Sequence, residues 1–278
     1  MTRRGLSELK VGGLTLRGVA KGGVETSLMV PEFKLLFDVG QVVSGAQSFD
    51  RILISHGHAD HLAGLHYLVS QRHLQDRPPP VVHVPAEIEA PLRAIFSAWR
   101  EIEDFDLTVD LRPVQPGDDL EVGKDLRARA LRTTHRVPSL AYCVDRITRK
   151  LKAEFHGRPR EELVAAKGAG VELTSPVRTP QLCVTGDTQI EFLQAHPEVL
   201  GVRVLVHEVT SWDERRSVEQ TRHWGHTHVD EMIPVSEGFT GEALVLVHRS
   251  MRHSLEEARA VVAARFPASV RDRVHVFA

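Results

Sequence analysis

Residues 51 to 61, Arg-Ile-Leu-Ile-Ser-His-Gly-His-Ala-Asp-His, decide the fold of this chain. The apolar start of the segment predicts a buried strand, and its end carries three imidazoles and one carboxylate, which together suit zinc or manganese. His56 and His58 are two residues apart, so on an extended segment both side chains point the same way. Asp60 and His61 are adjacent, so they diverge and can serve a second metal.

Two metal ions about 3.5–4 Å apart are a known device for hydrolysing phosphate esters and amides. The alternative is that these histidines are ordinary packed or surface residues, because the chain contains 16 of them. Four potential ligands between residues 56 and 61, directly after an apolar strand, favour the metal site.

The composition narrows the class of protein. With 278 residues the chain is long enough for a substantial core. A net charge of −2 gives no overall basic signal for nucleic acid, and the two cysteines, Cys143 and Cys183, are expected to be buried reduced thiols. The N-terminus lacks the apolar core of a signal peptide, and no run approaches the roughly 18 apolar residues of a membrane span. We therefore expect a cytoplasmic protein without membrane segments.

Short apolar runs between turn residues predict strands. These runs are 24–30, 34–39, 51–55, 81–84, 107–109, 126–131, 140–147, 181–185, 202–206, 243–247 and 273–277. Helical patterns fall at 59–74, 86–102, 160–167, 188–196, 229–238 and 254–265. Asp187 and Ser254 are candidate caps for two of these helices. The order predicts an α/β fold in which two mixed sheets are covered by helices, in a single domain over residues 1–278.

Further candidate ligands each end or follow a strand-like run. They are His135, Asp187, His207, Glu208, His226, His228 and His248. Taken singly, each is more often a packed histidine or a capping aspartate. As a set that follows the 56–61 motif, strand end after strand end, they predict the remainder of a metal site. Gly186 also lets the Asp187 carboxylate approach a metal closely.

The HxHxDH segment is the signature of the metallo-β-lactamase superfamily, and the order of the other pieces resembles its ribonuclease Z branch, which matures tRNA 3′ ends. The plant short form of tRNase Z is similar in its Gly-His-x-His segment and in a Leu-Lys-x-Glu-Phe stretch followed by Gly-Val-Glu. The matching pieces of this chain are 22–27, 36–40, 56–61, 134–135, 151–155, 170–172, 186–188, 207–208, 225–228 and 248–250.

This resemblance implies a four-layer αββα sandwich and two Zn²⁺ ions per chain, with Mn²⁺ as an alternative. One metal would bind His56, His58 and His135, and the other would bind Asp60, His61 and His248. Asp187 would bridge them. A hydroxide between the metals would then attack the phosphodiester at the 3′ end of precursor tRNA.

The resemblance also implies catalytic roles beyond the metal ligands. Asp60 would orient the hydroxide, and His226 would give a proton to the departing ribose 3′-oxygen. Glu208 would orient His226 and stabilise its charged form. Asp38 is either a partner of a metal-bound histidine or a turn aspartate. His228 is a bystander or a substrate contact, and His207 packs or contacts the outer part of the site.

The chain departs from the family after the last ligand. Residues 248–253 read His-Arg-Ser-Met-Arg-His, in which Ser250 and Arg252 match and could bind a phosphate but the two aromatic positions do not. Ala141 replaces a usual glycine. These changes bear on the substrate more than on the metals. A short basic arm near 145–172 is expected either to contact RNA phosphates or to be a solvated hairpin, and the resemblance implies a homodimer.

Three functions compete. The first is a zinc phosphodiesterase acting on precursor tRNA, and the second is a hydrolase of the same fold acting on a small phosphodiester, a thioester or a lactone. The third is a non-catalytic binding protein. The complete ligand set argues against the third. Asp187 argues against a β-lactamase, which typically has cysteine there, and the Glu208 and His226 pair argues against a glyoxalase-type thioesterase and favours phosphodiester cleavage.

Overall fold

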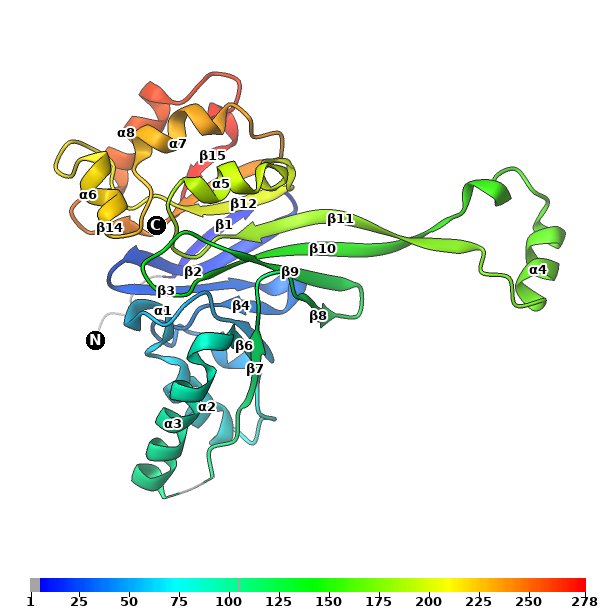
Figure 1. Ribbon diagram of the computed structural model, residues 1–278, viewed down its shortest axis with the longest axis horizontal. Coiled ribbons are helices and arrows are strands. Elements are labelled where there is room, and N and C mark those ends of the chain that lie inside the picture. The colour runs from blue at the N-terminus through cyan, green and yellow to red at the C-terminus, as the bar shows by residue number, and fades with distance from the viewer. Residues whose placement is uncertain (1–5, 105) are drawn as a thin grey trace.

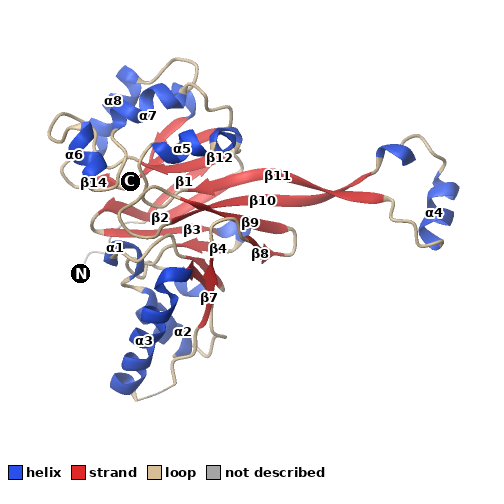
Figure 2. Cartoon of the chain, viewed as in Figure 1, coloured by secondary structure: helices blue, strands red, loops and turns tan. Residues whose placement is uncertain are grey.

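The computed structural model describes residues 6–104 and 106–278. Two sheets pack face to face, and each outer face is covered by helices (Figure 1; Figure 2). The helices are α1 (Ala59–Leu62), α2 (Leu65–His73), α3 (Ala86–Glu103), α4 (Arg160–Gly168), α5 (Glu191–Ala195), α6 (Val218–His223), α7 (Val229–Ser236) and α8 (Leu255–Arg265). The predicted four-layer αββα sandwich is therefore confirmed.

The first sheet runs in the order β1-β2-β3-β4-β5-β6-β7, and β14 pairs with β2. Its strands are β1 (Ser7–Val11), β2 (Leu14–Gly22), β3 (Glu25–Val30), β4 (Leu35–Phe37), β5 (Arg51–Leu53), β6 (Val81–Pro85), β7 (Asp110–Val114) and β14 (Arg249–Ser250). The second sheet runs β15-β13-β12-β11-β10-β9-β8. Its strands are β8 (Asp119–Gly123), β9 (Leu126–Arg132), β10 (Leu140–Leu151), β11 (Thr174–Val184), β12 (Val204–Glu208), β13 (Ala243–Val247) and β15 (Val274–Val276).

Three apolar clusters hold the layers together. The central cluster lies between the sheets and includes Leu16 and Phe37 from the first sheet and Tyr142 and Val206 from the second. A second cluster packs α5, α7 and α8 on the second sheet, and a third packs α2 and α3 on the first. Both faces of each sheet are buried, so nearly every residue of an inner strand gains free energy when its side chain is apolar. The inner strands are therefore nearly continuous apolar runs.

Parallel pairing places the candidate site residues at one rim of the sandwich. Strands β4, β5, β6 and β7 are parallel, and so are β11, β12, β13 and β15. Strands that run parallel end at the same edge of a sheet. Asp38 follows β4, the 56–61 motif follows β5, Glu208 ends β12, and His248 follows β13. The rim therefore gathers side chains that are far apart in the sequence.

The two-stranded hairpin β10–β11 extends far beyond the body and carries α4 at its tip (Figure 1). Its strands pair from Tyr142 with Val184 to Leu151 with Thr174, with one shift of register between Val144 and Asp145. The projecting segment therefore includes a return strand beyond residue 172. None of the described helices is long and apolar enough to cross a membrane.

Most predicted elements are present, with informative exceptions. The strand expected at 107–109 is wrong, because strand β7 begins at Asp110. The cap assigned to Asp187 is also wrong, since α5 begins at Glu191 after Ile190. Ser254 caps α8 as expected, and its hydroxyl accepts a hydrogen bond from Glu257 N. Strands β1, β2, β8 and the short β14 were missed. The edge strands β1 and β8 alternate more and less exposed residues instead of forming apolar runs.

Candidate metal centre

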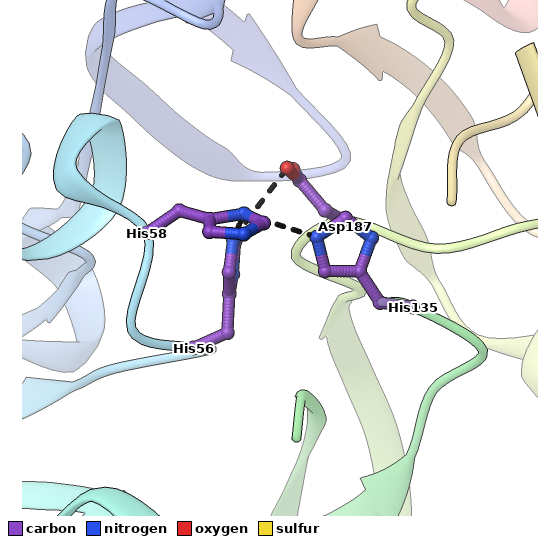
Figure 3. A group of neighbouring side chains, drawn as sticks. All are labelled: His56, His58, His135 and Asp187. Atoms are coloured by element: carbon purple, nitrogen blue, oxygen red, sulfur yellow. Dashed lines mark hydrogen bonds and ion pairs between the residues drawn. The ribbon is translucent and has the colours of Figure 1, made fainter. Parts of the chain in front are cut away.

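Three imidazole nitrogens converge on one point at the rim (Figure 3). His56 Nε2 lies 3.1 Å from His58 Nδ1, and His135 Nε2 lies 3.2 Å from the same atom. The ligands of a tetrahedral zinc ion are separated by about 3.3 Å when each bond is about 2.0 Å. With Asp187, whose Oδ2 is 3.6 Å from His56 Nε2, these atoms form a first cluster with the size of a metal shell.

A second group of donors lies beside the first. His61 Nε2 lies 3.3 Å from His248 Nε2. Asp60 Oδ2 is 3.6 Å from the His61 nitrogen and 3.4 Å from the His248 nitrogen. This second cluster unites α1 with the residue that follows β13, although the two are almost 190 residues apart in the sequence.

Asp187 joins the two clusters. Its Oδ2 faces His56, whereas its Oδ1 lies 3.3 Å from both His61 Nε2 and His248 Nε2. The carboxylate is buried, and Oδ1 forms no hydrogen bond within the described residues. An unpaired buried carboxylate oxygen is costly unless a cation binds it. The donor set therefore fits two metal ions that share Asp187.

The outer ring nitrogens of four histidines in the two clusters already have hydrogen-bond partners. His135 Nδ1 donates to Gly225 O at 2.8 Å, and His61 Nδ1 donates to Asp38 Oδ2 at 2.7 Å. His56 Nδ1 lies 2.9 Å from Ser55 Oγ, and His248 Nδ1 lies 2.9 Å from Thr210 Oγ1. In its neutral form each ring therefore holds its proton on Nδ1 and directs the lone pair of Nε2 at the cluster, which is the form that binds metal.

Asp38 supports a ligand in each cluster. Its Oδ2 accepts from His61 and also from the Ser55 hydroxyl at 2.8 Å, and its Oδ1 accepts from Ser55 N at 2.7 Å. Because the Ser55 hydroxyl donates its hydrogen bond to Asp38, its oxygen accepts a hydrogen bond from His56 Nδ1. Of the two roles considered for Asp38, the geometry fits the partner of a metal-binding histidine.

The electrostatics of the first cluster also suit metal binding. Burial lowers the pKa of His56, His58 and His135, so these imidazoles are neutral near pH 7 and can offer lone pairs. In the second cluster burial lowers the pKa of His61, but Asp187 and Asp38 outweigh burial and raise it well above its ordinary value. Asp187 and Asp38 stabilise positive charge at this position, and a bound metal ion would supply that charge in place of a proton on His61.

The backbone is shaped to bring these groups together. Asp38 and His248 adopt φ angles of 57° and 61°, a region that side chains other than glycine rarely occupy. Such residues cost of order 1–3 kcal/mol each and persist where their surroundings hold them. Gly225 has φ +82°, and a Cβ there would lie 2.6 Å from His135 Nδ1. Glycine is thus required for the close approach that anchors His135.

A charged pair flanks the clusters. Glu208 is fully buried, and its Oε1 lies 2.8 Å from His226 Nδ1. Burial lowers the pKa of His226, but the Glu208 carboxylate outweighs this and raises it to about 9. The His226 ring centre lies 5.2 Å from those of both His135 and His248, so it faces one ligand of each cluster.

Other predicted residues have different positions. His228 is the N-cap of α7, where its Nδ1 accepts from Asp230 N, and it is therefore a structural residue rather than a substrate contact. His207 is buried, with its Nδ1 donating to Glu208 O. Ser250 is buried beside the exposed Arg252, whose backbone nitrogen donates to the Ser250 hydroxyl at 3.4 Å. The phosphate contacts of Ser250 and Arg252 stay predictions.

The sequence reasoning did not identify Ser55 and Thr210 as supports of the site. Ser55 directly precedes His56, and Thr210 lies two residues after Glu208. A hydroxyl next to each predicted strand-end ligand was the available signal. Hydroxyls are common at strand ends, however, and which of them faces a ring nitrogen depends on the packing of distant strands.

Comparisons with known proteins agree with this geometry. The family model described as "Beta-lactamase superfamily domain" matches residues 27–249. The tRNase Z TRZ1 of Arabidopsis thaliana is 34% identical over 261 residues, which cover 93% of each chain. Two solved structures share the fold. The human short-form tRNase Z has a TM-score of 0.58 at 19% identity, covering 84% of this chain and 92% of that one. The Bacillus subtilis protein YhfI has a TM-score of 0.63 at 15% identity, covering 98% and 96%.

Asp38→Asn should weaken metal binding. The substitution keeps the size of the side chain but removes the charge of the carboxylate that accepts hydrogen bonds from both His61 and Ser55. We expect metal affinity to fall about 10–100-fold, the usual effect of losing such a partner. Competition with a chromogenic chelator measures the change. Asp272→Asn, at an exposed position, is the matched control, and equal affinities of both variants would contradict the role of Asp38.

Proposed function

We propose that this chain, which belongs to the tRNase Z family of the β-lactamase superfamily, hydrolyses the phosphodiester at the 3′ end of precursor tRNA. Its family makes it a metal-dependent hydrolase. The observation that carries the choice of bond is the His226–Glu208 pair beside the two donor clusters. The match to a plant tRNase Z over 93% of both chains supports the choice of substrate.

We propose Zn²⁺ as the metal at both clusters, with Mn²⁺ as the alternative, because imidazole and carboxylate donors suit both. His56, His58 and His135 would hold one ion, Asp60, His61 and His248 the other, and Asp187 both. When bound, a pair of metals supplies a hydrolytic water of lowered pKa and offsets negative charge on the phosphate. Asp60 lies partly exposed at the rim, where it can orient that water.

In this proposal His226 is the proton donor. Its Nδ1 is held by Glu208, so Nε2 is the nitrogen that can give a proton to the departing ribose oxygen. Glu208 is fixed by three further donors: Thr188 N, Thr227 N and the Thr210 hydroxyl. A carboxylate held in this way keeps the imidazole charged and oriented without rearranging during the reaction.

We further propose that the β10–β11 hairpin and α4 contact RNA phosphates in a cytoplasmic homodimer. The hairpin extends away from its own metal centre, so it is placed to meet RNA bound to a second copy (Figure 1). Some of its basic residues are paired, as Arg149 is with Glu172 and Arg158 with Glu162. Lys150 and Arg160 are exposed at the same end and can meet phosphates.

The deciding experiment compares two substrates. The purified protein should carry about two zinc ions per chain and cleave a precursor tRNA after the discriminator nucleotide. A chelator should abolish cleavage, and adding back zinc or manganese should restore it. If the protein hydrolyses a chromogenic phosphodiester but leaves precursor tRNA intact, it is a hydrolase of another substrate. If it hydrolyses neither with metal bound, it is a binding protein.

His226→Ala should retain the metals and lose most RNA cleavage. Losing a general acid lowers the rate about 10²–10⁴-fold. Metal content by elemental analysis and single-turnover cleavage are the two measurements. His196→Ala is the control, because the His196 side chain contacts the Phe192 ring and pairs with Glu198, neither of which belongs to the donor clusters. Full cleavage by His226→Ala would refute the proton-donor role.

Glu208→Gln should change the pH dependence of cleavage. His226 must carry a proton in order to donate it, so activity is lost as the pH rises through the pKa of His226. Glu208 raises that pKa to about 9 against the effect of burial. Replacing the carboxylate by an amide therefore moves the alkaline limb of the pH–rate profile to lower pH. An unshifted limb in the metal-loaded variant would show that another group sets it.

A further inference from the structure

A tryptophan and an arginine form an exposed stack beside the metal centre. The Arg136 guanidinium carbon lies 4.8 Å from the centre of the Trp224 ring. Trp224 is 47% exposed, although tryptophan is usually largely buried. Within the described ranges Arg136 forms no ion pair with a carboxylate. Its charge is therefore available to a ligand as well as to the ring.

The other two tryptophans, Trp212 and Trp99, are held by contacts within the protein. Trp212 is 1% exposed, and its indole nitrogen donates to Val209 O at 2.8 Å. Trp99 stacks on His66 at a centroid distance of 4.2 Å and an interplanar angle of 7°. Trp224 differs from both, because it is exposed and its aromatic neighbour His223 meets its ring edge-on at 85° instead of stacking on it. Tryptophan is enriched at interfaces, where its large ring contacts a partner and its N–H stays near water.

The backbone ties this stack to the centre. Arg136 directly follows the predicted ligand His135, and Trp224 precedes Gly225, whose carbonyl accepts from His135 Nδ1 at 2.8 Å. His226, the proposed proton donor, comes next in the chain. The stack thus lies next to one ligand of the first cluster and next to the proton donor.

We propose that Trp224, held by Arg136, is a stacking platform for the nucleobase on the 5′ side of the scissile phosphodiester. This inference rests on the proposed function, which supplies RNA as the substrate class. His226 gives its proton to the 3′-oxygen of that same nucleotide, so the base of the nucleotide lies nearest the segment that carries His226. An indole offers a π face to any of the four bases, and the guanidinium adds charge for the adjacent phosphate.

The test measures binding of the reaction product to the metal-loaded protein. The product is tRNA that ends at the discriminator nucleotide, and a second RNA has an abasic sugar at that position. Trp224→Ala should bind the base-bearing RNA about tenfold more weakly, since base–aromatic stacking is worth about 1–3 kcal/mol. Trp224→Phe should recover most of the affinity. The abasic RNA should bind the wild type and Trp224→Ala equally.

Trp99→Phe is the matched control and should leave the affinity for both RNAs unchanged, because Trp99 stacks on His66 and packs against the third apolar cluster instead of the metal centre. The slope of affinity against salt should also stay the same in Trp224→Ala, since no phosphate contact is removed. The platform is refuted if Trp224→Ala binds the base-bearing RNA as tightly as the wild type does. An equal loss of affinity for the abasic RNA refutes it as well.

Failure of the platform and failure of the proposed function give different results. A wild type that leaves precursor tRNA intact contradicts the proposed function, whereas the comparison of base-bearing and abasic product RNA still decides the platform. In a protein that cleaves precursor tRNA, the platform predicts that Trp224→Ala raises KM more than it lowers kcat. A loss in kcat alone would place Trp224 among the residues that orient His226.

Discussion

The structure depends on the Asp187 carboxylate, which lies buried between two groups of imidazoles. One of its oxygens faces His56, and the other faces His61 and His248. A buried carboxylate is tolerated only when positive charge or hydrogen bonds surround it. Opposing histidines hold the pKa of Asp187 well below its ordinary value despite the burial that raises it. Everything at the rim is arranged to meet this one charge.

The two-sheet sandwich brings these histidines to the Asp187 carboxylate. The other residues of the two clusters follow strands β5, β9 and β13. β5 and β13 lie in parallel ladders, and β9 runs in the same direction as β11 because each is antiparallel to β10, so these strands end at a common rim. The apolar cluster between the sheets fixes the distance between the two halves of the site. Second contacts then fix each ring, as Asp38 does for His61 and Gly225 does for His135. The core supplies position, and the hydrogen bonds supply orientation.

The sequence predicts the candidate metal-binding residues better than the residues that hold them in place, such as Ser55 and Thr210. The spacing of His56, His58, Asp60 and His61 is local, so it survives without knowledge of the fold. Strands with two covered faces, such as β13, are also visible as apolar runs. The alternating edge strands gave no such signal. Asp187 was expected both as a helix cap and as a metal ligand, and the local sequence did not exclude the cap because the neighbours of Asp187 in space are distant in sequence. The Arg136–Trp224 contact is equally non-local, since 88 residues separate its members.

The proposed proton donor and the proposed metal ligands share one hydrogen-bond network. Glu208 accepts from Thr188 N, next to Asp187, and from the Thr210 hydroxyl. That hydroxyl has a single proton, so once it donates to Glu208 its oxygen must accept from His248 Nδ1. The Glu208 carboxylate therefore sets the tautomer of a ligand in the second cluster while it also orients His226. Because the buried Glu208 contacts both groups, His226 and His248 keep a fixed geometry. In the proposed reaction, a phosphate held between them would meet the proton and the metal charge in one preorganised arrangement.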